Sequence, residues 1–204
     1  AAVAMLTACV LGCGGEAEKQ AASSKGTIGV SVLTMTNPFF KTIADTITAE
    51  AAANGYATTI TSGEFDVAKQ QNQVKDFIVN GCSAIVLCPC DSRSIGPAIE
   101  EANAAGIPVF TADIACLAEG VDVVSHIASD NLGGGRLAAE AMIEALGDGG
   151  GEVVVLDFKQ AESCILRVQG FKEVVEQHNA DHPDAVISIV AELPGDGKKD
   201  QGFK

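Results

Sequence analysis

The feature that most constrains the fold is a regular alternation of short apolar segments with longer helix-like segments. The apolar segments are rich in β-branched residues and carry few polar side chains, as in TIGVSVL at Thr27–Leu33. Strands without polar alternation are typical of parallel sheets, because both faces of such sheets are buried. Repeated strand–helix units of this length therefore predict an α/β fold, with parallel sheets covered by helices on both faces. The expected strands are residues 27–33, 57–61, 84–87, 108–111, 123–128, 153–156 and 185–191.

Capping residues mark where the expected helices begin. Asn37 followed by Pro38 is typical of an N-cap with proline at the first helical position. Asp66 and Ser163 occupy the same position before two later helical segments. Further helices are expected over residues 94–105 and 135–146. In the last of these, apolar residues at helical spacing predict one buried stripe made of Ala138, Ala141, Met142, Ala145 and Leu146.

The first fifteen residues, AAVAMLTACVLGCGG, contain no charged side chain. The segment is too short to span a bilayer and is typical of the apolar part of a signal peptide. Cys9 and Cys13 each end a short sequence that resembles the bacterial lipoprotein cleavage box, in which the cysteine is lipidated. We favour Cys13, because the polar tether GGEAEKQAASSK follows it, with Cys9 as the alternative. An ordinary secretory peptide, or a core strand with chance cysteines, is also compatible with this segment.

Charge and motifs exclude several classes of function. The net charge is −14, and no basic run exceeds Lys198-Lys199, which argues against a nucleic-acid partner. The sequence has no G-x-S-x-G elbow, G-x-G-x-x-G fingerprint or P-loop, so we expect neither an enzyme nor a nucleotide cofactor. Cys-Pro-Cys at residues 88–90 lacks the two-residue gap of zinc knuckles, and no metal site is expected.

Polar and aromatic residues follow the expected strands. Ligands of parallel sheets bind beyond the carboxyl ends of the strands. Asn, Asp and Arg each offer two polar atoms that can bind neighbouring hydroxyl groups, and Phe can cover the apolar face of a sugar ring. Alternatively, Asn37 is only a helix cap and the Phe pair belongs to the core. The candidate ligand-binding residues are Asn37, Phe39, Phe40, Asp113, Ser129, Asp130 and Arg167.

Four segments resemble the periplasmic ribose-binding proteins. Residues 36–40 (TNPFF) resemble their N-N-P-F-F segment, and residues 124–131 (VSHIASDN), followed by Gly133-Gly134, match their V-S-H-I-A-S-D-N…G-G stretch. Residues 111–113 look like their T-x-D, and residues 167–171 like their R-x-x-G-F. The similarity extends in order from about Thr27 to Lys204.

The resemblance implies the solute-binding component of a sugar ABC transporter. This family has a two-lobed type I periplasmic-binding-protein fold with a three-strand hinge and the sugar between the lobes. We expect residues 1–25 to be a lipoprotein-type signal and tether, 26–128 the first lobe and 129–204 a truncated second lobe. The implied protein is a monomer in the periplasm or cell envelope, attached to the membrane only by a lipid anchor, with a transporter permease as its partner. A 204-residue fragment lacking the rest of the clamp is expected to bind sugar poorly.

The resemblance also implies a role for each candidate residue. Asn37 would bind sugar hydroxyls, Phe39 and Phe40 would sandwich the ring, and Asp113 and Arg167 would bind from the first and second lobes. Ser129-Asp130 would lie at the first hinge crossing.

Three departures indicate a ligand or a pose different from that of ribose, while a small sugar or polyol stays the expected class. Ile114 replaces an Arg, Cys88 replaces an Asn, and residues 194–198 lack an aromatic side chain.

Two other classes of protein are compatible with the sequence. A regulator of the lac-repressor type shares this fold, but it needs a basic helix-turn-helix domain of about 60 residues before Thr27. A receptor that reports a sugar-like signal to a membrane sensor would have the same site. In an oxidising compartment, a disulfide between Cys116 and either Cys88 or Cys90 is compatible with the sequence, which does not decide whether it forms.

Overall fold

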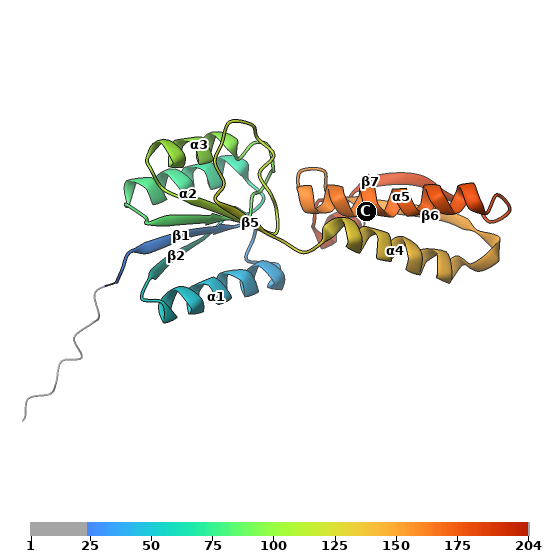
Figure 1. Cartoon of the computed structure of the whole chain (residues 1–204), viewed down its shortest axis with the longest axis horizontal. Coiled ribbons are helices and arrows are strands. Elements are labelled where there is room, and N and C mark those ends of the chain that lie inside the picture. Colours follow the sequence, from blue (N-terminus) through green and yellow to red (C-terminus); the bar gives the residue numbers. More distant parts are fainter. Residues whose placement is uncertain (1–23, 204) are drawn as a thin grey trace, which may run out of the picture.

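Two parallel sheets organise the structure, a computed structural model that describes residues 24–203 (Figure 1). The larger sheet has the strand order β2-β1-β3-β4-β5, and the smaller one pairs β6 with β7. All strand pairs are parallel. The strands are β1 (Thr27–Val32), β2 (Ala57–Ser62), β3 (Ala84–Leu87), β4 (Val109–Ala112), β5 (Ser125–Ile127), β6 (Gly151–Asp157) and β7 (Ile187–Pro194). The seven expected strands therefore all form, with ends that differ by no more than three residues.

Helices divide between the two sheets. The helices are α1 (Pro38–Ala53), α2 (Val67–Val79), α3 (Gly96–Ala104), α4 (Asn131–Leu146), α5 (Glu162–Asp181) and α6 (Lys199–Gly202), with a 3-10 turn, η1, at Gly147–Gly149. In the larger sheet α1 covers one face, and α2 and α3 cover the other (Figure 1). We call β1–β5 with α1–α3 the five-stranded unit, and β6 and β7 with α4–α6 the two-stranded unit.

The first two helix caps form as the sequence predicts. Asn37 Oδ1 accepts the N–H of Phe39 at 3.0 Å, and Asp66 Oδ1 accepts the N–H of Lys69 at 2.9 Å. These bonds satisfy backbone donors that have no partner inside the helix. The cap at Asn37 places α1 directly after β1, so Phe39 and Phe40 lie near the carboxyl edge of the sheet.

The predicted buried stripe of α4 is wrong. Ala138, Ala141, Met142 and Ala145 are exposed and Leu146 is half-buried, whereas Asn131, Gly135 and Ala139 are buried. The reason is a close backbone contact with α5. A Cβ on Gly135 would lie 2.0 Å from the carbonyl oxygen of Arg167, and one on Gly170 would lie 2.1 Å from that of Leu132. The face of α4 that carries Gly135 therefore packs against α5. The apolar pattern indicates a different face, which is exposed.

Two helix starts also differ from expectation. Helix α4 begins at Asn131 rather than at residue 135, because Asp130 Oδ1 accepts the N–H of Gly133 at 2.9 Å and caps the helix earlier. Ser163 does not cap α5, since the N-cap position is Ala161 and Ser163 is buried in the first turn. Arg167 consequently lies in the second turn of α5 and not in the first.

The two-stranded sheet has its long helices, α4 and α5, on one face, within the part of the chain that the structure describes. Val153 and Ile187 pack with Ala139 of α4 and Val175 of α5. Side chains that point the other way, such as Val154, are exposed. This alternation is typical of a sheet with one covered face. Helices cover both faces of the larger sheet, as the sequence predicts, and the short helix α6 lies near Leu156 on the more open face of the smaller sheet.

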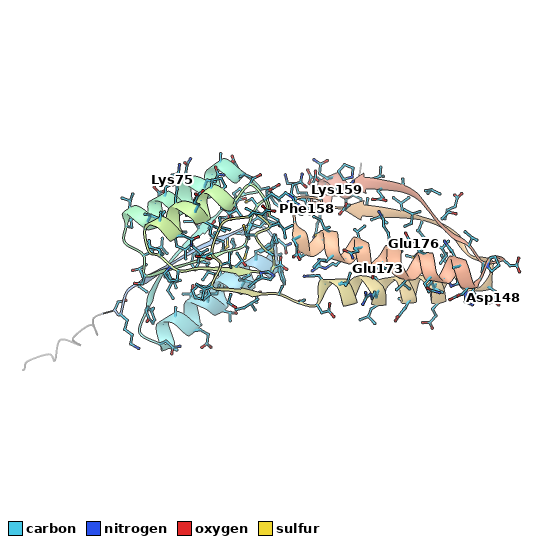
Figure 2. The ribbon with its side chains drawn as sticks, turned by 45° about the horizontal axis from the view of Figure 1, so that its top comes forward. Lys75, Asp148, Phe158, Lys159, Glu173 and Glu176 are labelled. Carbon is cyan, nitrogen blue, oxygen red and sulfur yellow. The ribbon has the colours of Figure 1, made fainter. Side chains whose placement is uncertain are left out.

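The chain passes between the units once in the described residues, through residues 128–130 between β5 and α4 (Figure 1). The units also touch directly. Phe158 and Ala161 of the two-stranded unit share a buried cluster with Leu33, Phe40 and Ile114 of the five-stranded unit, and Figure 2 shows Phe158 where the units meet. No helix within residues 24–203 is long and apolar enough to cross a membrane. The proposed lipidation sites Cys9 and Cys13 lie outside the described residues.

Candidate ligand-binding site

A cavity of about 280 Å³ lies between the two units. The five-stranded unit contributes side chains that follow its strands, and the two-stranded unit contributes the start of α5 and the loops after β6 and β7. The cavity thus lies at the carboxyl ends of the strands, where parallel sheets bind ligands. It is lined by Leu33, Asn37, Phe39, Phe40, Phe65, Asp113, Ile114, Phe158, Ala161, Ser163, Cys164, Arg167 and Gly197.

Five of the seven candidate residues line this cavity: Asn37, Phe39, Phe40, Asp113 and Arg167. Asn37 is both a helix cap and a lining residue, so the two alternatives for it do not compete. Its Oδ1 atom is occupied by the capping bond, which leaves the Nδ2 amide group to donate hydrogen bonds.

Asp113 has a special backbone conformation at the edge of the cavity. It directly follows β4 and has a φ of +64°, in the left-handed region that most side chains avoid. Its N–H donates to the carbonyl oxygen of Ile127 at 2.9 Å, which extends the pairing of β4 with β5. Asp is one of the few residues that tolerate this conformation, so the strand end fixes where the carboxylate lies.

Asp113 and Arg167 face the cavity from different units without forming an ion pair. Burial raises the pKa of the Asp113 carboxyl above its usual value, and electrostatic interactions with Arg167 and His126 oppose this rise in pKa. Arg167 is thus close enough to affect Asp113. Yet among the ion pairs of residues 24–203, whose oppositely charged atoms lie within 4.0 Å of each other, none joins Asp113 to Arg167. The space between them is open to a molecule that could bind both.

The two adjacent phenylalanines do not form a sandwich. The rings of Phe39 and Phe40 contact each other edge to face, with centroids 5.2 Å apart and an interplanar angle of 79°. A sugar ring does not fit between them, because a sandwich needs two roughly parallel rings with a gap between them. Phe40 is 5% exposed and packs in the core, whereas Phe39 is 51% exposed. Phe39 is therefore the ring that is free to cover a ligand.

Two aromatic side chains from other loops, Phe65 and Phe158, lie beside Gly197, in the segment 194–198 that has no aromatic residue of its own. The rings of Phe65 and Phe158 lie 6.2 Å apart, one from each unit. A Cβ on Gly197 would lie 3.6 Å from both rings. Gly197 thus lies beside two aromatic rings contributed by other loops, and the cavity has an apolar wall despite the missing aromatic residue.

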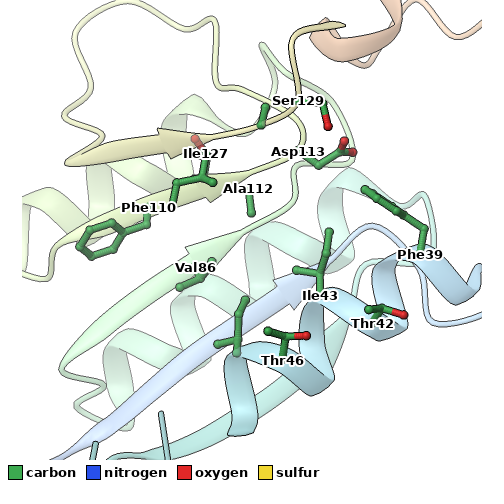
Figure 3. Close-up of a pocket in the computed structure, with 13 residues that line it drawn as sticks. Phe39, Thr42, Ile43, Thr46, Val86, Phe110, Ala112, Asp113, Ile127 and Ser129 are labelled. Carbon is green, nitrogen blue, oxygen red and sulfur yellow. The ribbon is translucent and has the colours of Figure 1, made fainter. Parts of the chain in front are cut away.

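Ser129 and Asp130 lie in the passage between the units and not in the cavity. Ser129 lines a neighbouring groove of about 510 Å³ that lies between α1 and the ends of β3, β4 and β5 (Figure 3). Asp113 and Phe39 line both spaces. In Figure 3, Asp113 and Ser129 lie close together at neighbouring strand ends, and Phe39 faces them from α1. Asp130 caps α4 through its carboxylate.

Sequence reasoning missed Phe65, Ser163 and Cys164 as lining residues. Phe65 lies in a loop with a φ of +60°, which no local pattern indicates. The sequence pattern predicts Ser163 as the cap of α5 and so places the start of this helix two residues late, whereas Ser163 and Cys164 lie in its first turn. Phe158 had a usable signal, since it directly follows β6.

The disulfide that the sequence left open, between Cys116 and Cys88 or Cys90, is not formed. Cys82, Cys88, Cys90, Cys116 and Cys164 are free thiols. Cys88 and Cys90 lie in the buried cluster beneath α1, whereas Cys116 packs against the cluster formed by α2 and α3 residues. The larger sheet separates these clusters. Burial raises the pKa of the Cys88 and Cys90 thiols to about 12, which makes them unreactive in the folded protein. In residues 24–203, no group of three His, Cys, Asp or Glu side chains could hold a metal ion.

The fold and the site together define a class: two α/β units whose strand ends enclose a small cavity with polar donors and acceptors from both. Such a site suits reversible binding of a small polyhydroxylated molecule. A family model described as periplasmic binding protein domain matches residues 28–204, and the chain belongs to that family. The family consists of binding proteins rather than enzymes, and the resemblance seen in the sequence is confirmed.

Curated relatives carry names of sugar import proteins. The ribose import binding protein RbsB of Haemophilus influenzae is 32% identical over 189 residues, which are 93% of this chain and 62% of that protein. RbsB of Bacillus subtilis is 37% identical over 74% of this chain and 49% of its own length. The D-apiose import binding protein of Paraburkholderia graminis is 38% identical over 69% of this chain and 45% of its own length. The chain thus spans at most 62% of the length of these relatives.

Solved structures confirm the fold class. A galactofuranose-binding protein superposes with a TM-score of 0.76 at 23% identity, over 86% of this chain and 58% of that one. The Caulobacter myo-inositol-binding protein gives a TM-score of 0.75 at 26% identity, over 86% and 57%. A Mycobacterium smegmatis ABC transporter solute-binding protein with bound glycerol gives 0.70 at 30% identity, over 81% and 55%.

Proposed function

We propose that this chain is part of an exported solute-binding protein that captures a monosaccharide or polyol between two lobes and delivers it to an ABC transporter permease. The observation that carries the proposal is the pair Asp113 and Arg167, which face one cavity from different units without a direct ion pair. A ligand that binds both groups stabilises the arrangement in which the units are close together. The names of the relatives, which cite ribose and D-apiose, support a small sugar as the ligand.

In this proposal residues 26–128 form the first lobe, residues 129–204 belong to the second, and Ser129-Asp130 lie at a hinge. Asn37 donates to ligand hydroxyls, Asp113 accepts from them and Arg167 donates from the opposite side. Phe39 covers an apolar face of the ligand, and Phe40 supports Phe39 from the core. Ile114 adds an apolar wall where ribose binders have Arg, which favours a ligand or pose different from that of ribose.

The proposal extends to the location of the protein. The family is periplasmic, and residues 1–25 have the composition of a signal followed by a polar tether. We place the protein in the periplasm or cell envelope as a monomer, held at the membrane by a lipid on Cys13 or Cys9.

A thermal-shift and calorimetry screen tests the proposal on the complete gene product that carries this chain. The ligands are D-ribose, D-apiose, D-allose, xylitol, myo-inositol and glycerol. We expect at least one to raise the melting temperature and to bind with a measurable heat. Arg167→Ala should lose this binding, whereas Arg136→Ala, an exposed residue of α4 paired with Glu173, should keep it. No stabilisation by any ligand, or equal binding by both variants, would contradict the proposal.

A further inference from the structure

Helix α5, which carries Arg167 and Cys164 to the cavity, has no cap of its own. Its N-cap residue is Ala161, whose side chain has no hydrogen-bond acceptor. The first N–H groups of a helix need acceptors from outside the helix, and the N-cap side chain usually provides one. Here the N–H of Glu162, the first helical residue, donates to Ser92 Oγ at 3.0 Å.

Ser92 belongs to the other unit. It lies in the loop between β3 and α3 and is 2% exposed. Its own N–H donates to the carbonyl oxygen of Gln160 at 2.8 Å, so Ser92 makes two hydrogen bonds to the segment that starts α5. Both bonds exist only while the two units are in contact.

The loop that holds Ser92 is fixed within the five-stranded unit. The Ser92 carbonyl oxygen accepts the N–H of Leu117 at 2.6 Å. The neighbouring Asp91 carboxylate accepts the N–H groups of Arg93 and Ser94 at 2.9 and 2.7 Å. Ser92 is therefore presented to α5 by a loop that is already ordered, and the acceptor needs little rearrangement when the units meet.

We propose that Ser92 is a positioning residue that caps α5 from the opposite unit when the cleft closes. This inference rests on the proposed function, since it assumes that the units open and close around a ligand. When the units separate, water replaces the serine hydroxyl at the Glu162 N–H and α5 keeps no side-chain cap. The cap therefore favours the closed arrangement, in which Arg167 faces Asp113 across the cavity.

The expected effect follows from the strength of N-caps. Removing an N-cap hydroxyl shifts a helix equilibrium by about 2- to 30-fold. We expect Ser92→Ala to lower the closed-to-open ratio of the unliganded protein by about this factor. Apparent ligand affinity falls with the closed fraction, because the closed form is the one that binds on both sides.

Small-angle X-ray scattering and amide hydrogen exchange test the inference on the unliganded complete gene product. Ser92→Ala should increase the radius of gyration and speed exchange in the segment containing Glu162. Ser94→Ala, an exposed serine two residues along the same loop, should change neither. Ala161→Ser adds a cap within α5 itself. The added hydroxyl would cap α5 without replacing the hydrogen bond from Ser92, and Ala161 itself lies in the buried cluster between the units. In the S92A background the substitution should therefore slow exchange again without restoring the smaller radius of gyration.

The inference is overturned if S92A is as compact as the wild type, or if A161S restores compactness to S92A. The second result would show that Ser92 only stabilises the helix. Ser92→Gly removes the same hydroxyl and is judged by the same criteria if S92A does not fold. All these readouts are taken without ligand, so a negative sugar screen would count against the proposed function and not against the cap.

Discussion

At the residue scale, the backbone geometry of Asp113 decides where its carboxylate lies at the edge of the cavity. Its left-handed backbone fixes the carboxylate at the end of β4, and partial burial raises its pKa. A raised pKa means that the folded state binds this proton more tightly than the unfolded chain does. Arg167, His126 and Glu162 are the titratable or charged groups that act on the Asp113 carboxyl.

Asp113→Asn should remove one component of the pH dependence of stability. In the wild type, this component is fully present below the unfolded pKa, near 3.8, and is lost as pH rises through the higher folded pKa. Asn has no such titration and also tolerates a positive φ, so the backbone is not strained. Urea unfolding of both proteins between about pH 3.5 and 7 measures the difference in the free energy of unfolding. Relative to D113N, the wild type should lose stability as pH rises; a constant difference, or one of opposite sign, would exclude this origin.

At the scale of elements, the crossing of α4 and α5 depends on two glycines. Gly135 and Gly170 bring the two helix backbones so close that a methyl group has no room at either position. Arg167 lies at this crossing, because its carbonyl oxygen is the atom that a Cβ on Gly135 would contact, and its side chain lines the cavity.

Gly135→Ala should destabilise the protein by about 1–3 kcal/mol, because overpacking forces the helices apart. The neighbouring Gly134→Ala is a matched control. Nothing lies within 4 Å of a Cβ there, and alanine is the better helix former, so it should be neutral or stabilising by up to about 1 kcal/mol. Denaturant unfolding compares the two variants. Equal effects of both substitutions would show that the close contact carries no energetic weight.

The elements themselves could largely be predicted from the sequence, because their signals are local. Asn37 and Asp66 are caps that act within one turn, and the apolar strands need only their own composition. The start of α5 could not be predicted, since its acceptor is Ser92, 70 residues away in sequence. The prediction of which face of α4 is buried was wrong for a related reason. Gly135 packs through its backbone, and a hydropathy pattern does not reveal such a contact.

The candidate site could be predicted where its residues lie at strand ends, and not where they come from irregular loops. Asn37, Asp113 and Arg167 follow or flank strands, so parallel topology brings them to one cavity. Phe65 comes from a loop with no pattern of its own. The sandwich by Phe39 and Phe40 failed because ring orientation depends on packing around Phe40, which the sequence does not encode locally.

At the scale of the whole molecule, residues 128–130 form the exposed passage that joins the two units within residues 24–203. The units also touch through the buried contact around Phe158 and Ala161 and through the hydrogen bonds of Ser92. In the proposed function, the backbone bends at this passage when the units move apart. A ligand that contacts both units opposes that movement.

Limited proteolysis should therefore cut the unliganded gene product at or near Ser129. A broad-specificity protease such as subtilisin needs an exposed and deformable segment, and this passage is exposed. The ligand identified by the thermal-shift screen should slow the cut by restricting the passage. Mass spectrometry of the products locates the cleavage site. Initial cleavage inside α1 or α2 instead, or a rate that saturating ligand leaves unchanged, would contradict this picture.

The conformation of Asp113 has a consequence for how such a protein can change its ligand. With a φ of +64°, position 113 admits Asp, Asn or Gly at little cost and resists almost everything else. Its neighbour Ile114 lines the same cavity and carries no such restriction. In a mutational library or in natural divergence, preference for new ligands should therefore be acquired at residue 114 and in the facing loops. Residue 113 should vary only among Asp, Asn and Gly.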